Sequence, residues 1–114
     1  MTTREISEMI ASVGIPYAYD HFDREDAERP EGPPFICFLY PERGGFAADD
    51  CDYVTIAALA VELYTDNIDF DLEARLEAAL MASDLVFSKE QNWIDAERMY
   101  QTTYTTEVIL THEQ

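Results

Sequence analysis

The stretch VELYTDNIDFDLEARLEAAL, residues 61–80, predicts a strand that turns directly into a helix. Before the turn, residues alternate in polarity as they do on a half-buried strand. After the turn, leucine and alanine recur at the spacing of a helix with one buried side, and the opposite, exposed side is expected to show Glu73, Arg75 and Glu77. The bend between them holds polar residues that suit a tight turn, namely Asp66, Asn67, Asp69 and Asp71. Such a corner indicates a sheet with a helix packed against it.

The acidic residues of this corner raise the question of a calcium site. An EF-hand loop needs glycine at its sixth position and a bidentate glutamate at its twelfth. Counted from Asn67 or from Asp69, both positions hold leucine or alanine, so neither register fits. We expect Asp69 to cap the helix over 70–82 instead, and Asp71 to interact with the positive end of its dipole.

The segments before the corner predict one helix and two strands. Thr2 and Glu5 form a capping box for a helix over 3–13, which Gly14 ends. The apolar run FICFLY, 35–40, predicts a strand with little exposed surface, and a second strand is expected over 53–64. A short apolar piece around Tyr17 to Tyr19 precedes acidic, proline-rich residues 23–34, for which we expect an exposed loop, and PERGGFAADD, 41–50, suits a turn.

After the second helix, two segments rich in β-forming residues predict a hairpin. They cover 85–94 and 99–110, with a loop at 95–98. Helices and strands thus alternate along the chain, and hairpin-linked strands favour antiparallel pairing. We therefore predict a single α+β domain over 1–114, with a mostly antiparallel or mixed sheet of about four strands and two helices packed on one face.

The charge of the chain restricts its partners. There are 24 acidic against 7 basic residues, a net charge of −17, and the acids divide equally, twelve in residues 1–57 and twelve in 58–114. A negative surface repels phosphate backbones, which argues against ordinary nucleic-acid binding. Three interpretations remain: a protein that lies near DNA without adhering to it, an acidic decoy for a DNA-binding protein, or, most commonly, a solvated surface that keeps a small protein soluble.

The sequence offers no catalytic constellation and no cofactor motif, so we expect a protein that is not an enzyme. The acidic clusters around Asp50 and around His21 lack the spacing of a metal site, and short acidic runs in turns are usually only hydrated. Cys37 or Ser88 with His21 would be the candidate nucleophile and base, but a cysteine in an apolar strand is more commonly a buried, inert thiol. Cys37 and Cys51 are both expected as free thiols.

The N-terminal segment and the hydropathy predict neither a signal peptide nor a membrane span. We expect a protein that is cytosolic or released by lysis. Aromatic residues outside the obvious core are the more informative feature: Phe46 in a polar turn, Trp93 after a polar run, and Tyr100 and Tyr104 on a threonine-rich strand. Interfaces favour aromatic anchors, so protein–protein contact is the leading functional expectation, with Phe46, Trp93 and Tyr100 as candidate interface residues.

Four stretches occur in a characteristic order: PFICFLYP, an acidic stretch leading to Tyr53, VELYTDNIDFDLEARLEAAL, and SKEQNWIDAERMYQTTYTTEV. Together, over about 15–108, they resemble the small tail-component proteins encoded in the head-to-tail connector module of long-tailed phages and prophages, especially those of Gram-positive hosts. The similarity lies in structural phrases and not in a catalytic signature. No functional residue is therefore carried over from the family.

The resemblance implies a structural role as a tail-completion or tail-terminator protein. Such a protein sits in the virion neck as a ring, commonly a hexamer, on the last ring of tail-tube protein. Its partners would be its own copies and tail-tube or neck proteins, while DNA passes nearby without specific binding. We expect the loops 23–34 and 41–52 and the aromatics Phe46 and Trp93 to face neighbours. The alternative is an acidic DNA mimic that inhibits a DNA-binding protein.

Overall fold

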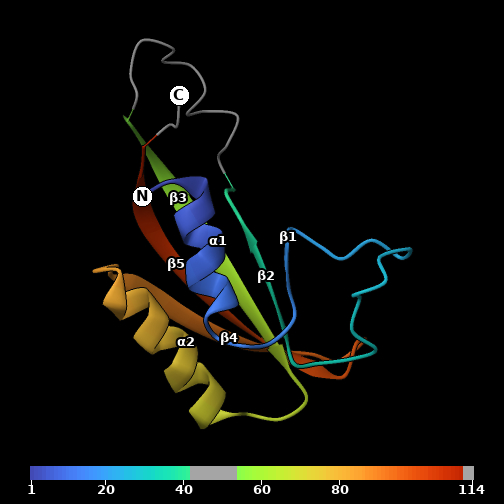
Figure 1. Ribbon diagram of the computed structural model, residues 1–114. Helices are drawn as coiled ribbons and strands as arrows, with labels where there is room; N and C mark the ends of the chain where they lie inside the picture. Colours follow the sequence, from blue (N-terminus) through green and yellow to red (C-terminus); the bar gives the residue numbers. More distant parts are fainter. Residues whose placement is uncertain (42–53, 112–114) are drawn as a thin grey trace.

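The computed structural model describes residues 1–41 and 54–111, which form an α+β fold of two helices and a mixed five-stranded sheet (Figure 1). In chain order the elements are α1 (Thr3–Ala11), β1 (Tyr17–Tyr19), β2 (Phe35–Leu39), β3 (Val54–Thr65), α2 (Phe70–Ala82), β4 (Phe87–Ile94) and β5 (Met99–Thr111). The predicted fold class is confirmed. The sheet has one strand more than expected because β1 is too short to show a pattern in the sequence.

The strand order across the sheet is β1-β2-β3-β5-β4. β1 runs parallel to β2, and the other neighbours are antiparallel. β3 and β5 form the long centre of the sheet and pair along their whole shared length, from Val54 opposite Thr111 to Thr65 opposite Tyr100. β5 is last in sequence but lies between β3 and β4, so the predicted hairpin forms the end of the sheet.

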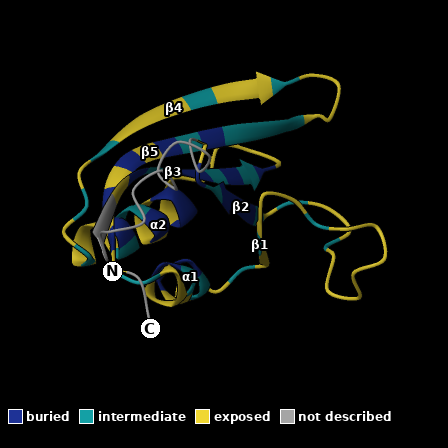
Figure 2. Ribbon diagram, turned by 90° about the horizontal axis from the view of Figure 1, so that it is seen from above, coloured by how far each residue is buried: buried dark blue, intermediate teal, exposed yellow. Residues whose placement is uncertain are grey.

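Both helices pack on the same face of the sheet, as the two perpendicular views agree (Figures 1 and 2). The strand residues on that face are buried, while those on the opposite face are mostly exposed or half-buried. The core consists of alternate strand residues and one side of each helix, and its fully buried members include Ile6, Ile10, Leu59, Val61, Leu63, Leu76, Leu80, Tyr104 and Val108. The face of the sheet without helices is therefore largely accessible among the described residues.

The helix ends follow the local sequence signals. Thr2 and Glu5 form the expected capping box, and Asp69 caps α2 by accepting a hydrogen bond from the Leu72 amide at 3.0 Å. α1 ends at Ala11, two residues before the predicted end, and the chain then turns at Gly14, whose φ of +89° suits glycine. Capping motifs therefore set where both helices begin.

Two residues lie deeper than the sequence pattern suggested. Glu73 was expected on the exposed side of α2 but is only 3% exposed, because that flank of the helix packs against inward-facing residues of β4. Tyr104 was grouped with aromatics outside the core but is 0% exposed. β5 is a central strand, and its inward positions lie under the helices, which explains the burial of Tyr104.

Candidate functional site

Two of the three predicted interface residues lie together on the β4–β5 hairpin. Trp93 and Tyr100 are opposite each other in the strand register, and their rings meet edge to face with centroids 4.9 Å apart. Trp93 remains 43% exposed and donates a hydrogen bond from its indole nitrogen to the Asp95 carboxylate. Phe46 lies outside the described residues. The hairpin thus presents a preformed aromatic pair, which is the kind of anchor that interfaces use.

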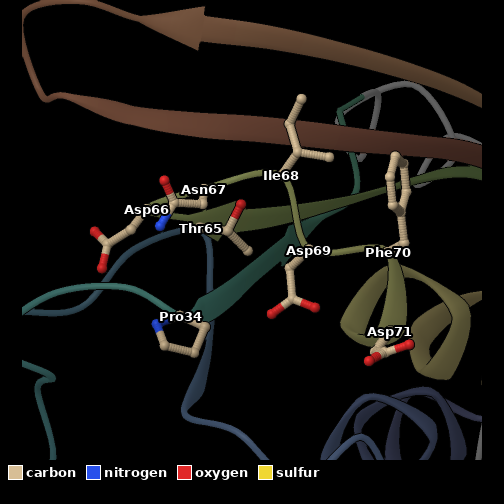
Figure 3. A pocket seen from close by; sticks show the side chains of 8 residues that line it. All are labelled: Pro34, Thr65, Asp66, Asn67, Ile68, Asp69, Phe70 and Asp71. Atoms are coloured by element: carbon tan, nitrogen blue, oxygen red, sulfur yellow. The ribbon is translucent and has the colours of Figure 1, made fainter.

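The acidic corner between β3 and α2 forms an open cavity of about 470 Å³ (Figure 3). The side chains of Asp66, Asp69 and Asp71 are spread along the bend and do not converge on one point (Figure 3). Asp69 is already engaged as the cap of α2. Within residues 1–41 and 54–111, no group of three or more acidic, histidine or cysteine side chains could hold a metal ion. Asp69 therefore has a structural role at this corner, as the cap of α2.

His21 lies between two carboxylates in the loop after β1. Its Nδ1 is 2.8 Å from Asp20 Oδ2, and its Nε2 is 3.0 Å from Asp23 Oδ1, with all three side chains exposed. Hydrogen bonds to Asp20 and then to Asp23 raise the pKa of His21 above its ordinary value. The sequence placed these residues in one cluster, and in the structure His21 contacts both carboxylates.

Cys37 does not have the surroundings of a nucleophile. The residue is 5% exposed, and burial, with a smaller effect of the nearby Glu62, raises the pKa of its thiol to about 11, which opposes the reactive thiolate. His21 and Cys37 line one cavity, yet both ring nitrogens of His21 contact carboxylates. Ser88 lies on β4, which is separated from β2 by two strands, β3 and β5. The candidate nucleophiles and the candidate base are thus not arranged for proton transfer.

A polar cluster lies beneath α2, where sequence patterns predicted only a solvated helix side. The Lys89 amine on β4 is 2.7 Å from Glu73 Oε1 and 2.8 Å from Glu77 Oε2. Gln91 donates to Glu73 at 3.0 Å, and the Tyr104 hydroxyl donates to Glu77 at 2.7 Å. Phe87, Lys89 and Gln91 occupy every second position of β4 and therefore share one face of the strand. That period-two spacing is the signal that could have placed Lys89 and Gln91 inward.

The sequence pattern also did not reveal an aromatic group beside the loop 23–34. Phe35 and Tyr64 stack with centroids 4.8 Å apart, and the ring of Phe22 meets Phe35 edge to face at 5.8 Å. These rings, with His21 and Met99, line a cavity of about 390 Å³ between the loop and the end of the β4–β5 hairpin. Loop and hairpin therefore meet at one end of the sheet, on the face opposite to that of Trp93.

In the part of the chain that the structure describes, no helix is both long enough and apolar enough to cross a membrane.

No protein-family model matches the chain, and no curated protein matches it either.

Proposed function

We propose that this protein is a non-enzymatic structural component of a phage or prophage tail. It completes or terminates the tail by assembling as a ring, expected to be a hexamer, on the tail tube at the neck of the virion. Its partners are its own copies and tail-tube or neck proteins, and assembly takes place in the cytoplasm of the bacterial host. The proposal rests on the resemblance of the four stretches described above and on the charge and surface of this chain.

The net charge of −17 is the observation that carries the proposal. The acids are shared equally by the two halves of the chain, so the charge does not come from a single acidic tail. A cationic wall would bind the phosphates of passing DNA, whereas a negative wall lets DNA traverse a channel without being held. The charge therefore suits a protein that surrounds DNA but does not bind it.

Ring closure needs a heterologous contact, in which two different surfaces of neighbouring copies meet. The exposed loop 23–34 and the hairpin carrying Trp93 and Tyr100 supply surfaces of different composition, the first acidic and the second aromatic. Aromatic side chains that remain partly exposed in the single chain are the usual anchors of such contacts. These residues are our candidates for the ring interface.

The proposal is tested by the native mass of the purified protein, measured by light scattering from low micromolar to near-millimolar concentration at low and high salt. We expect a closed oligomer near the mass of a hexamer, favoured by salt because screening reduces repulsion between negative subunits. Negative-stain images should show a central channel. Monomers or dimers under every condition would contradict self-assembly into a ring and would favour the DNA-mimic alternative.

The interface assignment is tested separately with a double variant, Phe46→Ala with Trp93→Ala. We expect it to remain folded and to lose the ring, because truncating central aromatic anchors removes much of the energy of an interface. Tyr17→Ala, which truncates an exposed aromatic on β1, is the matched control and should assemble normally. Normal assembly by the double variant would refute the assignment and leave the function itself unaffected.

A further inference from the structure

The outer edge of β4 is unpaired among the described residues. Every residue of β4, from Phe87 to Ile94, pairs with β5 on one side, and β4 is the last strand in the sheet order. The strand is eight residues long and contains no proline, whereas β1, at the other edge, has three residues. Short strands and prolines are the usual protection of a sheet edge, and β4 has neither. Its outward backbone groups are available to another strand.

An inward-pointing charge is a further means of protecting an edge strand, and Lys89 occupies such a position. Its charge is satisfied within the chain, however, because Glu73 and Glu77 of α2 both hold the amine within 2.8 Å. Gln91 is likewise bound to Glu73 and Thr102. The inward side of the edge is therefore neutralised in place and does not repel an added strand.

The flank of α2 next to this edge carries apolar side chains without a partner among the described residues. Phe70 is 77% exposed, and Ala74, Ala78 and Met81 are exposed on the same side of the helix. By helical spacing this side lies beyond Glu77, toward β4, while Arg75 lies on the opposite flank and donates to the Val13 carbonyl of α1. An added strand would bring its own inward side, or its own helix, against this apolar flank.

We propose that a second copy of this chain covers the edge, with the two β4 strands antiparallel about a two-fold axis at Gln91. The axis is perpendicular to the sheet, so the two sheets become continuous and both α2 helices lie on one face. A two-fold contact uses the same surface on both copies, which is the commonest arrangement in soluble oligomers. The pair forms in the free protein and does not depend on the proposed function; because both contacts use Trp93, the pair would have to separate before the hairpin joins a ring.

Charge decides the register of this pair. With the axis at Gln91, Lys89 lies opposite the partner's Trp93, Glu90 opposite the partner's Asn92, and Ser88 opposite the partner's Ile94. Lys89 beside an indole ring is a favourable contact, and no like charges face each other. Moving the axis by one residue to Glu90 places Glu90 opposite its own copy, which is unfavourable. Charge therefore favours the axis at Gln91 over the axis at Glu90.

The same axis brings the α2 helices together at small side chains. Gln91 lies level with Glu73, since its amide donates to that carboxylate at 3.0 Å, and the next residue, Ala74, is exposed. Alanine at the crossing lets two helices approach closely, with one Phe70 on each side of it. The exposed area of Phe70 is then buried by the partner, which accounts for an aromatic ring on the outer side of a helix.

The proposal is tested with two variants of one exposed residue, Asn92→Glu and Asn92→Lys. Glutamate would face the partner's Glu90 twice in each pair, and we expect the dimer dissociation constant to rise on the order of tenfold. Lysine would face the same carboxylates and should lower that constant. Ala27→Glu and Ala27→Lys make the same charge changes in the exposed loop 23–34 and should leave it nearly unchanged. Sedimentation equilibrium measures all four variants against the unmodified protein.

The register is tested by disulfide formation between Glu90→Cys and Asn92→Cys variants, each with Cys37→Ala and Cys51→Ser. We expect a cross-linked dimer when the two are mixed and little from either alone, because residue 90 faces residue 92 of the partner. A monomer at every concentration, or equal effects of the Asn92 and Ala27 substitutions, would overturn the proposal. Dimers without rings would uphold it and contradict the ring function, so the two proposals fail separately.

Discussion

His21 is held between Asp20 and Asp23, and its protonation should contribute to stability. Hydrogen bonds to these carboxylates raise its pKa, so the folded protein favours the charged imidazole. The contribution is fully present below the ordinary pKa of 6.5 and is lost as the pH rises through the raised value. We expect His21→Gln to lower the melting temperature in mildly acidic buffer and to have little effect in alkaline buffer.

Thermal unfolding of both proteins between about pH 5 and about pH 9 checks this dependence. Asp23→Asn, which removes one of the two carboxylate charges, should give a smaller change of the same sign. A difference between the unmodified protein and His21→Gln that is constant with pH would show that the contact does not depend on the charge of the imidazole.

Among the residues that the structure describes, Lys89 is the only cation that contacts both Glu73 and Glu77. Lys89→Met keeps most of the side-chain volume but leaves the buried Glu73 carboxylate without its counterion. We expect a loss of about 1–3 kcal/mol in the free energy of unfolding, since the amine is partly exposed and water moderates the cost. Urea denaturation measures this loss, with Glu90→Gln on the opposite face of β4 as a control that should change little.

The cost of Lys89→Met should depend on pH. Burial tends to raise the pKa of Glu77, but hydrogen bonds from Lys89 and Tyr104 outweigh it and lower the pKa. The stabilisation from this carboxylate is therefore present above its ordinary pKa of 4.5 and is lost as the pH falls through the lowered value. The difference in the free energy of unfolding between Lys89→Met and the unmodified protein should therefore become smaller in acid. A gap that widens in acid would contradict this account.

At the scale of elements, the start of α2 depends on one side chain. Asp69 accepts a hydrogen bond from the Leu72 amide, which otherwise has no partner in the first turn of the helix. Asp69→Ala should lower the free energy of unfolding by about 1 kcal/mol. Asp69→Asn can still accept the hydrogen bond and should retain most of the stabilisation that the cap provides. Asp66→Ala removes a neighbouring charge without removing a cap and should have a smaller effect. Chemical denaturation distinguishes the three.

The elements that could be predicted are those whose signals are local. Capping residues at Thr2 and Asp69 and the alternation along β5 each lie within one segment, so a single sequence reveals them. β1 could not be predicted because three residues carry no period, and its place depends on pairing with β2. The burial of Glu73 could not be predicted either, because it depends on Lys89 in another element.

For the whole molecule, sequence patterns predicted the layers but only part of the candidate site. Trp93 and Tyr100 were selected separately, and the hairpin register brings their rings together. The aromatic group of Phe22, Phe35 and Tyr64 joins a loop to two strands, so no segment of the sequence contains its pattern. Surfaces assembled from distant segments require the register of the sheet, which a single sequence does not specify.

The position of β5 in the sheet has a consequence for how the protein is made. A ribosome delivers β3 and β4 first, but in the folded protein neither pairs with the other, since both border β5. Until residues 99–111 emerge, the apolar side of β3 and the leucines of α2 lack the strand that completes their core. Folding therefore finishes only after nearly all of the described chain has been synthesised, and interrupted chains are the species most prone to aggregate.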